Sequence, residues 1–193
     1  MIKIKMGVRY EASFVPLVYP KYADFQIAHT LFLLKKFGKI TITTASIDGK
    51  AVESIGSLKT EVDIPLHKVD VANYDLILLP GGDGIADVLH EEVISLIFKN
   101  AAQATIPIAS ICGAAALLAK AEVLKGKRFT CFIHTVQENE TIFELATYTG
   151  KDIEVDEQII TAKGTAFAEL AVSVGEQLTI FSSSKQKDTL YNF

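Results

Sequence analysis

Short apolar runs alternate along this chain with longer stretches that favour helices. Largely apolar runs at residues 14–19, 75–79 and 107–111 predict strands, as do the β-branched segments 40–45 and 159–162. Helices are predicted at 24–37, where apolar residues recur at helical spacing, at 91–102, from just after Cys112 to near Gly126, and at 166–181. This alternation predicts an α/β sandwich, with helices on both faces of a mostly parallel sheet.

Several local signals refine this outline. Asp24 stands where a helix N-cap is expected, and Asp48-Gly49 predicts a turn, after which a hairpin is one arrangement. Residues 128–135 predict a further strand. Residues 1–13 do not fit the alternation cleanly, and the polar tail 182–193 is expected to be loosely held. We therefore expect a single domain over residues 1–193, with its core at about 14–181.

Composition narrows the class of protein. The chain has 193 residues, of which 49% are hydrophobic and 22% charged, as in an ordinary globular domain. The net charge is −4 and the basic residues are scattered, so no nucleic-acid partner is expected. No apolar run reaches the ~18 residues of a membrane span. The N-terminus lacks the apolar core of a signal peptide, and two cysteines are too few for a disulfide framework. We expect a cytoplasmic protein without a membrane association.

Cys112 is the main candidate for chemistry. It lies between a predicted strand and a predicted helix, and small residues, Ser110 and Ala114, stand two positions before and after it. A nucleophile elbow needs this arrangement, because the chain turns sharply there and exposes the side chain above the sheet. The alternative, that Cys112 is a small buried hydrophobe, describes most free cysteines. The sequence leaves both interpretations open.

Two glycines provide a second candidate feature. Gly81 and Gly82 follow the predicted strand 75–79, so their loop lies at the same edge of the sheet as Cys112. Glycines allow backbone N–H groups to approach a ligand closely, and such groups stabilise a developing oxyanion. Together with the N–H of Gly113, these groups are predicted to face the thiol.

Several segments resemble the ThiJ/PfpI superfamily. They are YDLILLPGG at 74–82, ASIC at 109–112, LLAKA at 117–121, LKGK at 124–127, ITAKGTA at 160–166 and YPKYADF at 19–25. This flavodoxin-like group shares the fold of class I glutamine amidotransferases. It includes a Parkinson-associated redox protein and the so-called intracellular proteases. The resemblance spans roughly residues 14–181, and it implies a three-layer sandwich and a homodimer.

The resemblance also implies a set of site residues. The family places the elbow cysteine beside N–H groups of the Gly-Gly loop and a glutamate at the start of the first helix. Cys112, Gly81 and Gly82 match, but the glutamate position is occupied by Gln26. A glutamine amide donates a hydrogen bond but cannot exchange a proton near neutral pH. Asp24 is an alternative acid, although its N-cap role is favoured.

A histidine partner for the thiol is not evident. Protease-like relatives carry a histidine directly after the cysteine, where this chain has Gly113. His134 is near the segment where some relatives place a histidine, and the alternative is a surface histidine. His29, one turn after Gln26, is equally open. Cys131 is expected to pack in the core, and no metal-ligand spacing or cofactor motif is present.

Three functions remain compatible with these features. One is a cysteine-dependent enzyme of hydrolase or glyoxalase type that acts on a small carbonyl or amide substrate without a cofactor or metal. Another is a non-catalytic redox-sensing or stress-response protein in which an oxidant modifies Cys112; this alternative does not need an acid or base at position 26. The third is a binding or assembly module in which Cys112 is inert.

Overall fold

Four of the five pairings between neighbouring strands of the central sheet are parallel. The computed structural model describes residues 13–181. The sheet has the strand order β11-β12-β8-β7-β1-β2, and only the pair β11–β12 is antiparallel. Apart from β11, this is the order of a flavodoxin-like fold. The strands are β1 (Ser13–Pro16), β2 (Thr41–Ile42), β7 (Leu76–Leu79), β8 (Ile108–Ile111), β11 (Ile153–Asp156) and β12 (Ile159–Ala162).

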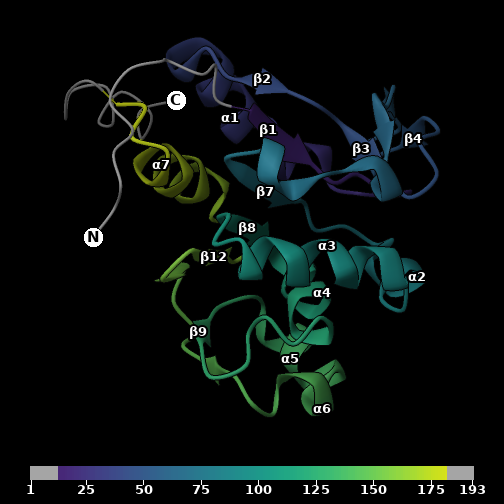
Figure 1. Ribbon diagram of the computed structural model, residues 1–193. Helices are drawn as coiled ribbons and strands as arrows, with labels where there is room; N and C mark the ends of the chain where they lie inside the picture. The colour runs from purple at the N-terminus through teal and green to yellow at the C-terminus, as the bar shows by residue number, and fades with distance from the viewer. Residues whose placement is uncertain (1–12, 182–193) are drawn as a thin grey trace.

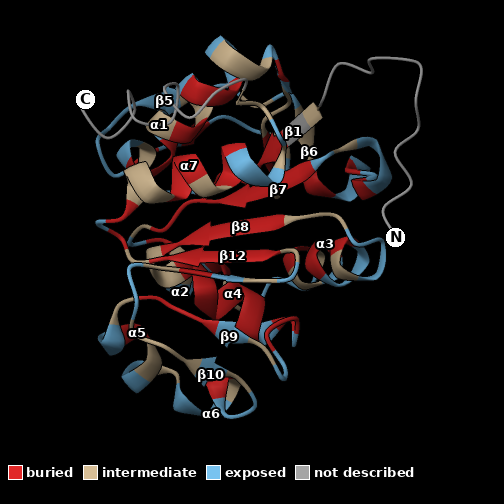
Figure 2. Cartoon of the chain, turned by 90° about the vertical axis from the view of Figure 1, so that its left-hand side faces the viewer, coloured by how far each residue is buried: buried red, intermediate tan, exposed pale blue. Residues whose placement is uncertain are grey.

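The central strands are buried on both faces, as the apolar runs predicted. Every residue of β7, β8 and β12 is buried, and Figure 2 shows these strands in red through the middle of the molecule. Helices cover the two faces (Figure 1). On one side, α1 (Asp24–Leu33) packs against α7 (Phe167–Gln177), and α7 contacts β8 and β12. On the other, α3 (Glu92–Gln103) packs against α4 (Ala115–Lys120) and β8. The three-layer α/β sandwich is confirmed.

Smaller elements surround this sandwich. The pair β3 (Ala45–Ser46) and β6 (Ile64–Pro65) is parallel, as is the pair β9 (Arg128–Phe129) and β10 (Thr147–Tyr148). Strands β4 (Val52–Glu53) and β5 (Lys59–Thr60) form the antiparallel hairpin after the Asp48-Gly49 turn. The remaining helices are α2 (Ile85–Val88), α5 (Ile133–Glu138) and α6 (Glu140–Phe143), with short helical turns η1 (Leu34–Gly38), η2 (Leu66–Lys68), η3 (Val71–Asn73) and η4 (Cys112–Ala114).

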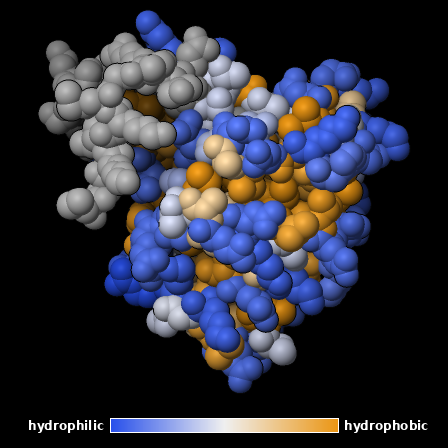
Figure 3. All heavy atoms as spheres, viewed as in Figure 1, coloured by the Kyte–Doolittle hydropathy of each residue, from blue (hydrophilic) through white to orange (hydrophobic). Residues whose placement is uncertain are grey.

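The surface is mixed in character. On the face shown in Figure 3, hydrophobic side chains lie exposed between the lobe of β3 and β4 and the helices α2 and α3, with hydrophilic side chains around them.

None of the helices within residues 13–181 is long and apolar enough to cross a membrane. Residues 1–12, which do not fit the alternation, and the tail 182–193, which was expected to be loosely held, lie outside the described residues.

Three sequence predictions about local structure are wrong. Residues 128–135 do not form one strand, because β9 ends at Phe129 and α5 begins at Ile133. A helix of six residues has fewer than two turns, too few for its periodicity to show. Asp24 is the first residue of α1 and Ala23 occupies the N-cap position, without a side-chain cap.

The helix after Cys112 ends at Lys120 rather than near Gly126. Glu122 has a positive φ of 61° beyond the end of α4. The N–H of Glu122 donates to the carbonyl of Ala119, and the N–H of Val123 donates to the carbonyl of Leu118. This pair of bonds is a Schellman motif, which terminates a helix and is usually built on glycine.

A buried carboxylate joins β9 to the edge strand β11. Glu154 is only 4% exposed, and its oxygens lie 2.9 Å from Lys151 Nζ and 3.3 Å from Arg128 Nε. Burial by itself would raise the pKa of Glu154. The hydrogen bond from Lys151, with the charges of Lys151 and Arg128, outweighs burial and holds that pKa below its ordinary value. The backbone N–H of Arg128 also donates to Asp156, which fixes β9 alongside β11.

Replacing Glu154 by glutamine is expected to flatten the acid dependence of stability. Because folding lowers the pKa of Glu154, its stabilisation is present above about pH 4.5, the ordinary value, and is lost as the pH falls through the lower folded value. Urea unfolding should therefore show a deficit in the free energy of unfolding of Glu154→Gln at pH 7 that shrinks below pH 4.5. Glu157→Gln, at an exposed ion pair with Lys127, should change stability by less than ~1 kcal/mol. A deficit that is constant with pH would contradict the role of the charge.

Candidate active site

Three loops meet at the carboxyl edge of the parallel sheet. They follow β1, β7 and β8, and parallel strands bring such loops to one edge. Backbone contacts join the first two, since the N–H of Ala23 donates to the carbonyl of Gly81 at 2.8 Å and Tyr22 pairs with Gly82. The hairpin β4–β5 holds the first loop from outside, because the N–H of Ile55 donates to the carbonyl of Tyr22.

Cys112 occupies a strained turn directly after β8. Its φ is +61°, and it begins the helical turn η4, which continues into α4. A residue other than glycine in this left-handed region costs about 1–2 kcal/mol, so the surrounding structure must hold it there. The side chain is half-buried. These are the geometric features of a strand–turn–helix elbow.

The thiol lines a cleft of about 460 Å³. Gln26, Gly82 and Gly113 contribute to the same lining, as does His134 from α5. Asp24 and Gly81 are absent from it. The other lining residues are Ala23, Phe25, Ile55, Asp83, Ile85, Ala86, Leu89, Ala116, Thr135, Glu138 and Asn139. The structure thus brings together residues from the β1, β7 and β8 loops and from α5.

Gln26 bridges two loops beneath the thiol. Its Oε1 accepts a hydrogen bond from the N–H of Gly81 at 3.0 Å, and its Nε2 donates to the carbonyl of Gly164 at 3.3 Å. The side chain is buried, and this orientation sets the amide oxygen against an N–H group and the amide nitrogen against a carbonyl. Gly81 was expected to offer its N–H to an oxyanion. That N–H is instead occupied by Gln26, so the remaining loop donors at the cleft are those of Gly82 and Gly113.

Gly164 was not recognised as a site residue from the sequence. A methyl group added there would lie 3.0 Å from Cys112 Sγ and 3.0 Å from Gln26 Nε2. A methyl group on Gly81 would similarly lie 2.6 Å from Cys112 Cβ. The two glycines therefore leave space for the thiol and the amide to sit side by side. The segment 160–166 resembled the superfamily, but nothing in its spacing relative to Cys112 pointed to this contact.

The histidine candidates separate in space. His134 is exposed near the start of α5 and stacks on Phe132, with ring centroids 5.5 Å apart, in the same cleft as Cys112. None of the hydrogen bonds found among residues 13–181 joins it to the thiol. His29 stacks on Phe167 and is absent from the cleft lining. Of these two histidines, His134 is therefore the one that a molecule bound in the cleft of Cys112 would contact.

Two buried groups behind the thiol are not available for chemistry. Burial, with a contribution from the charge of Cys112, raises the pKa of Cys131 to about 12. Tyr19 donates to the carbonyl of Pro80 at 2.6 Å, and burial followed by the charge of Cys112 raises its pKa well above the ordinary value. Cys131 is fully buried, consistent with the expected core packing.

Replacing Gln26 by glutamate is expected to make stability fall as the pH rises. A carboxyl group can donate to the Gly164 carbonyl only when it is protonated, so folding would raise its pKa. Its contribution would be complete below the unfolded pKa and lost as the pH rises through the higher folded pKa. The free energy of unfolding of Gln26→Glu should drop by ~1–3 kcal/mol relative to the wild type between pH 4 and pH 8.

The exposed Gln103, at the end of α3, provides the matched control. Gln103→Glu makes the same chemical change without a buried carbonyl to satisfy, so its pH dependence should follow that of the wild type. If the stability of Gln26→Glu also follows the pH dependence of the wild type, the hydrogen bond to the Gly164 carbonyl does not require a neutral donor at position 26.

Comparisons with known proteins agree with this architecture. The model of the DJ-1/PfpI family matches residues 14–177. "Uncharacterized protease YdeA" of Bacillus subtilis is 28% identical over 176 residues, which cover 91% of this chain and 87% of the relative. "Deglycase PH1704" of Pyrococcus horikoshii is 31% identical over 132 residues, 68% of this chain and 72% of that protein.

Solved structures share the fold. The DJ-1 superfamily protein Atu0886 of Agrobacterium tumefaciens superposes with a TM-score of 0.85 at 22% identity and covers 94% of this chain, which spans 97% of that protein. Drosophila melanogaster DJ-1beta has a TM-score of 0.80 at 21% identity and covers 95% of this chain and 97% of its own. With the family match over most of its length, the chain belongs to the DJ-1/PfpI family.

Proposed function

We propose that the protein is a cysteine-dependent enzyme of hydrolase or glyoxalase type that acts on a small carbonyl or amide compound. The observation that carries the proposal is the positive φ of Cys112, at the strand–helix turn, with its thiol in the 460 Å³ cleft. Strain of this kind persists where the surroundings over-determine it, and it concentrates at active sites. The names of two relatives, a protease and a deglycase, support a hydrolase-like activity.

The chemistry would begin at the sulfur. The Cys112 thiolate attacks the carbonyl carbon, a C–S bond forms, and the π electron pair moves to the oxygen. The N–H of Gly113 is the donor best suited to receive that oxyanion, because it belongs to the first turn after the elbow, where N–H groups lack intrahelical partners. With an amide substrate, the tetrahedral adduct expels the protonated amine and water then hydrolyses the thioester.

Proton transfer must come from groups other than Gln26. The Gln26 amide is neutral and is already bonded to Gly81 and Gly164. His134 is the one histidine of the cleft lining, and general bases are most often histidines. We assign it the role of exchanging protons with the reacting compound in the cleft that it shares with Cys112.

A second candidate function is favoured by Gln26 itself. In redox sensing, the thiolate attacks a peroxide oxygen, the S–O bond forms as the O–O bond breaks, and hydroxide leaves and is protonated to water. Sulfur is oxidised and peroxide is reduced, without any need for an acid at position 26. The Gln26 amide has two N–H groups and Gly164 uses one, so the other can bind an oxygen on the sulfur.

The expected homodimer and cytoplasmic location stay predictions. The surface that would carry a dimer is the outer face of α1, where Phe25, Ala28 and Phe32 are exposed at helical spacing. Both cysteines are free thiols, which favours a reducing compartment.

Removal of the thiol is expected to abolish turnover. Purified protein should convert methylglyoxal or hydrolyse small amides, and Cys112→Ala should lower kcat/KM by at least ~10³-fold, because the nucleophile is lost. Cys131→Ala serves as the matched control, since that thiol is buried with a raised pKa and should leave kcat/KM within a few-fold of the wild type. Activity that survives in Cys112→Ala would remove the enzyme proposal.

The redox candidate makes a different prediction. After mild peroxide treatment, intact mass should increase by about 16 or 32 Da, for one or two oxygen atoms. Peptide mapping should locate the added oxygen at Cys112 and leave Cys131 unmodified. Oxidation divided equally between the two thiols, or absent from both, would count against a sensing role.

A further inference from the structure

The cleft around Cys112 carries unbalanced negative charge. Its lining contains two carboxylates, Asp83 from the loop after β7 and Glu138 at the end of α5, and none of the lysines and arginines among residues 13–181. Both carboxylates are exposed. In the part of the chain that the structure describes, neither takes part in an ion pair. A molecule that approaches the thiol therefore meets two uncompensated carboxylates.

Four described cations of the surrounding segments are absent from the cleft lining. Lys163 precedes Gly164, but its ammonium group is 3.2 Å from Asp152. Lys21 approaches Gly82 through its backbone carbonyl, while its side chain is exposed and outside the lining. Arg128 and Lys151 pair with Glu154 at the far sheet edge. None of these side chains lines the cleft.

The remaining walls are largely apolar. Phe25 and Ile55 line the cleft and are about half exposed, and Ile85 and Leu89 come from α2 and the residue after it. Such walls bind a hydrocarbon group by removing apolar surface from water. The lining therefore combines an apolar contact surface with negative charge.

We propose that this cleft selects uncharged and positively charged electrophiles that carry an apolar group, and that it rejects anions such as 2-oxo acids. The proposal rests on the proposed function in that Cys112 is the reacting atom. A bound carboxylate would add a third negative charge beside Asp83 and Glu138, and the described lining has no lysine or arginine to receive it. A cation would be attracted to the same place, and the field acts on the rate of approach as well as on affinity.

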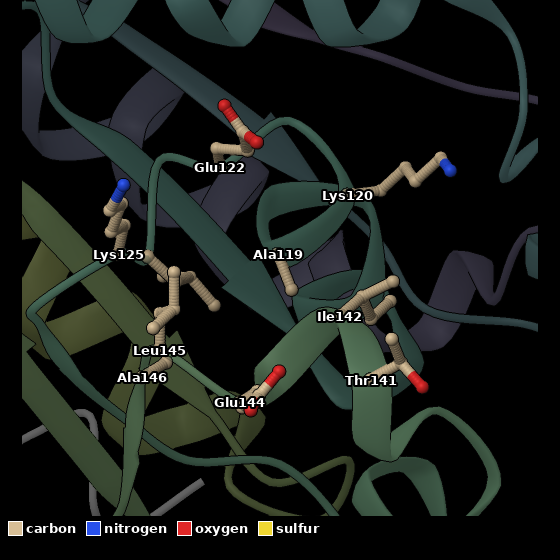
Figure 4. A pocket seen from close by; sticks show the side chains of 10 residues that line it. Ala119, Lys120, Glu122, Lys125, Thr141, Ile142, Glu144, Leu145 and Ala146 are labelled. Atoms are coloured by element: carbon tan, nitrogen blue, oxygen red, sulfur yellow. The ribbon is translucent and has the colours of Figure 1, made fainter.

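A second pocket of the molecule differs from the Cys112 cleft in its balance of charged residues. It has a volume of about 240 Å³ and lies beyond the end of α4 that is remote from Cys112. Figure 4 shows Lys120 and Lys125 around it together with Glu122 and Glu144. Its acidic and basic groups balance, and it contains no thiol. Glu122 therefore offers a control site at which a carboxylate can be removed without changing the cleft.

The charge preference can be measured without any turnover. Two methanethiosulfonate reagents, one with a trimethylammonioethyl group and one with a sulfonatoethyl group, each form a disulfide with Cys112 and release methanesulfinate. Each rate is divided by the rate with 2-mercaptoethanol, which removes the intrinsic difference between the reagents. At ~20 mM salt we expect a normalised preference of about tenfold for the cationic reagent, falling towards unity at 1 M salt as screening increases.

Substitutions test whether Asp83 and Glu138 cause the preference for the cationic reagent. The double variant Asp83→Asn/Glu138→Gln should bring the normalised ratio close to unity. Glu122→Gln, which lowers the overall negative charge of the chain by one unit, should leave the ratio within twofold of the wild type. Equal normalised rates in the wild type, or a preference that survives the double substitution, would overturn the inference while leaving the proposed nucleophile intact. A folded protein in which neither reagent modifies Cys112 would overturn both.

Discussion

The parallel pairing of β1, β7, β8 and β12 is the constraint on which the rest of the structure depends. Four strands that run in one direction end at one edge, and the loops after β1, β7 and β8 must then share the same space. The strands themselves hold position through burial, since every residue of β7, β8 and β12 is shielded from water. The strained backbone at Cys112 relies on this rigid base, because an isolated turn would relax from a φ of +61°.

Gln26 gives this edge a fixed chemistry. It links the Gly-Gly loop to Gly164, which follows β12, and so connects loops from β1, β7 and β12 around the thiol. A carboxylic acid could make the same two bonds only in its neutral form, whereas the amide makes them at every pH at which the protein is folded. The cost is that the amide cannot transfer a proton. A catalytic reaction at Cys112 therefore needs another group to transfer protons, which is the role proposed for His134. Oxidation of the thiol needs no such group at position 26.

The sequence predicted the order of the strands and helices better than the residues at which they end. The apolar run at 75–79 corresponds to β7, and 159–162 coincides with β12. The ends of three helices were hard to predict from the sequence, because glycine usually marks such an end and none of them has one there. Thr105, Glu122 and Thr179 adopt the positive φ instead, just beyond α3, α4 and α7. Their backbone N–H groups bond carbonyls of the preceding turn. Packing of α3 and α7 on the sheet, and of α4 on α3 and α6, sustains a conformation that the residue type disfavours.

The sequence by itself determined the alternation of elements, the position of Cys112 at a strand–helix junction and the absence of an acid at position 26. These follow from residue types and short spacings, which act within a few residues of each other. Only the tertiary structure decided that Gln26 occupies the N–H of Gly81, that Gly164 faces the thiol, and that Asp83, Glu138 and His134 share its cleft. Those contacts join residues far apart in the chain, so they depend on the path of the backbone through the sheet, which no local pattern encodes.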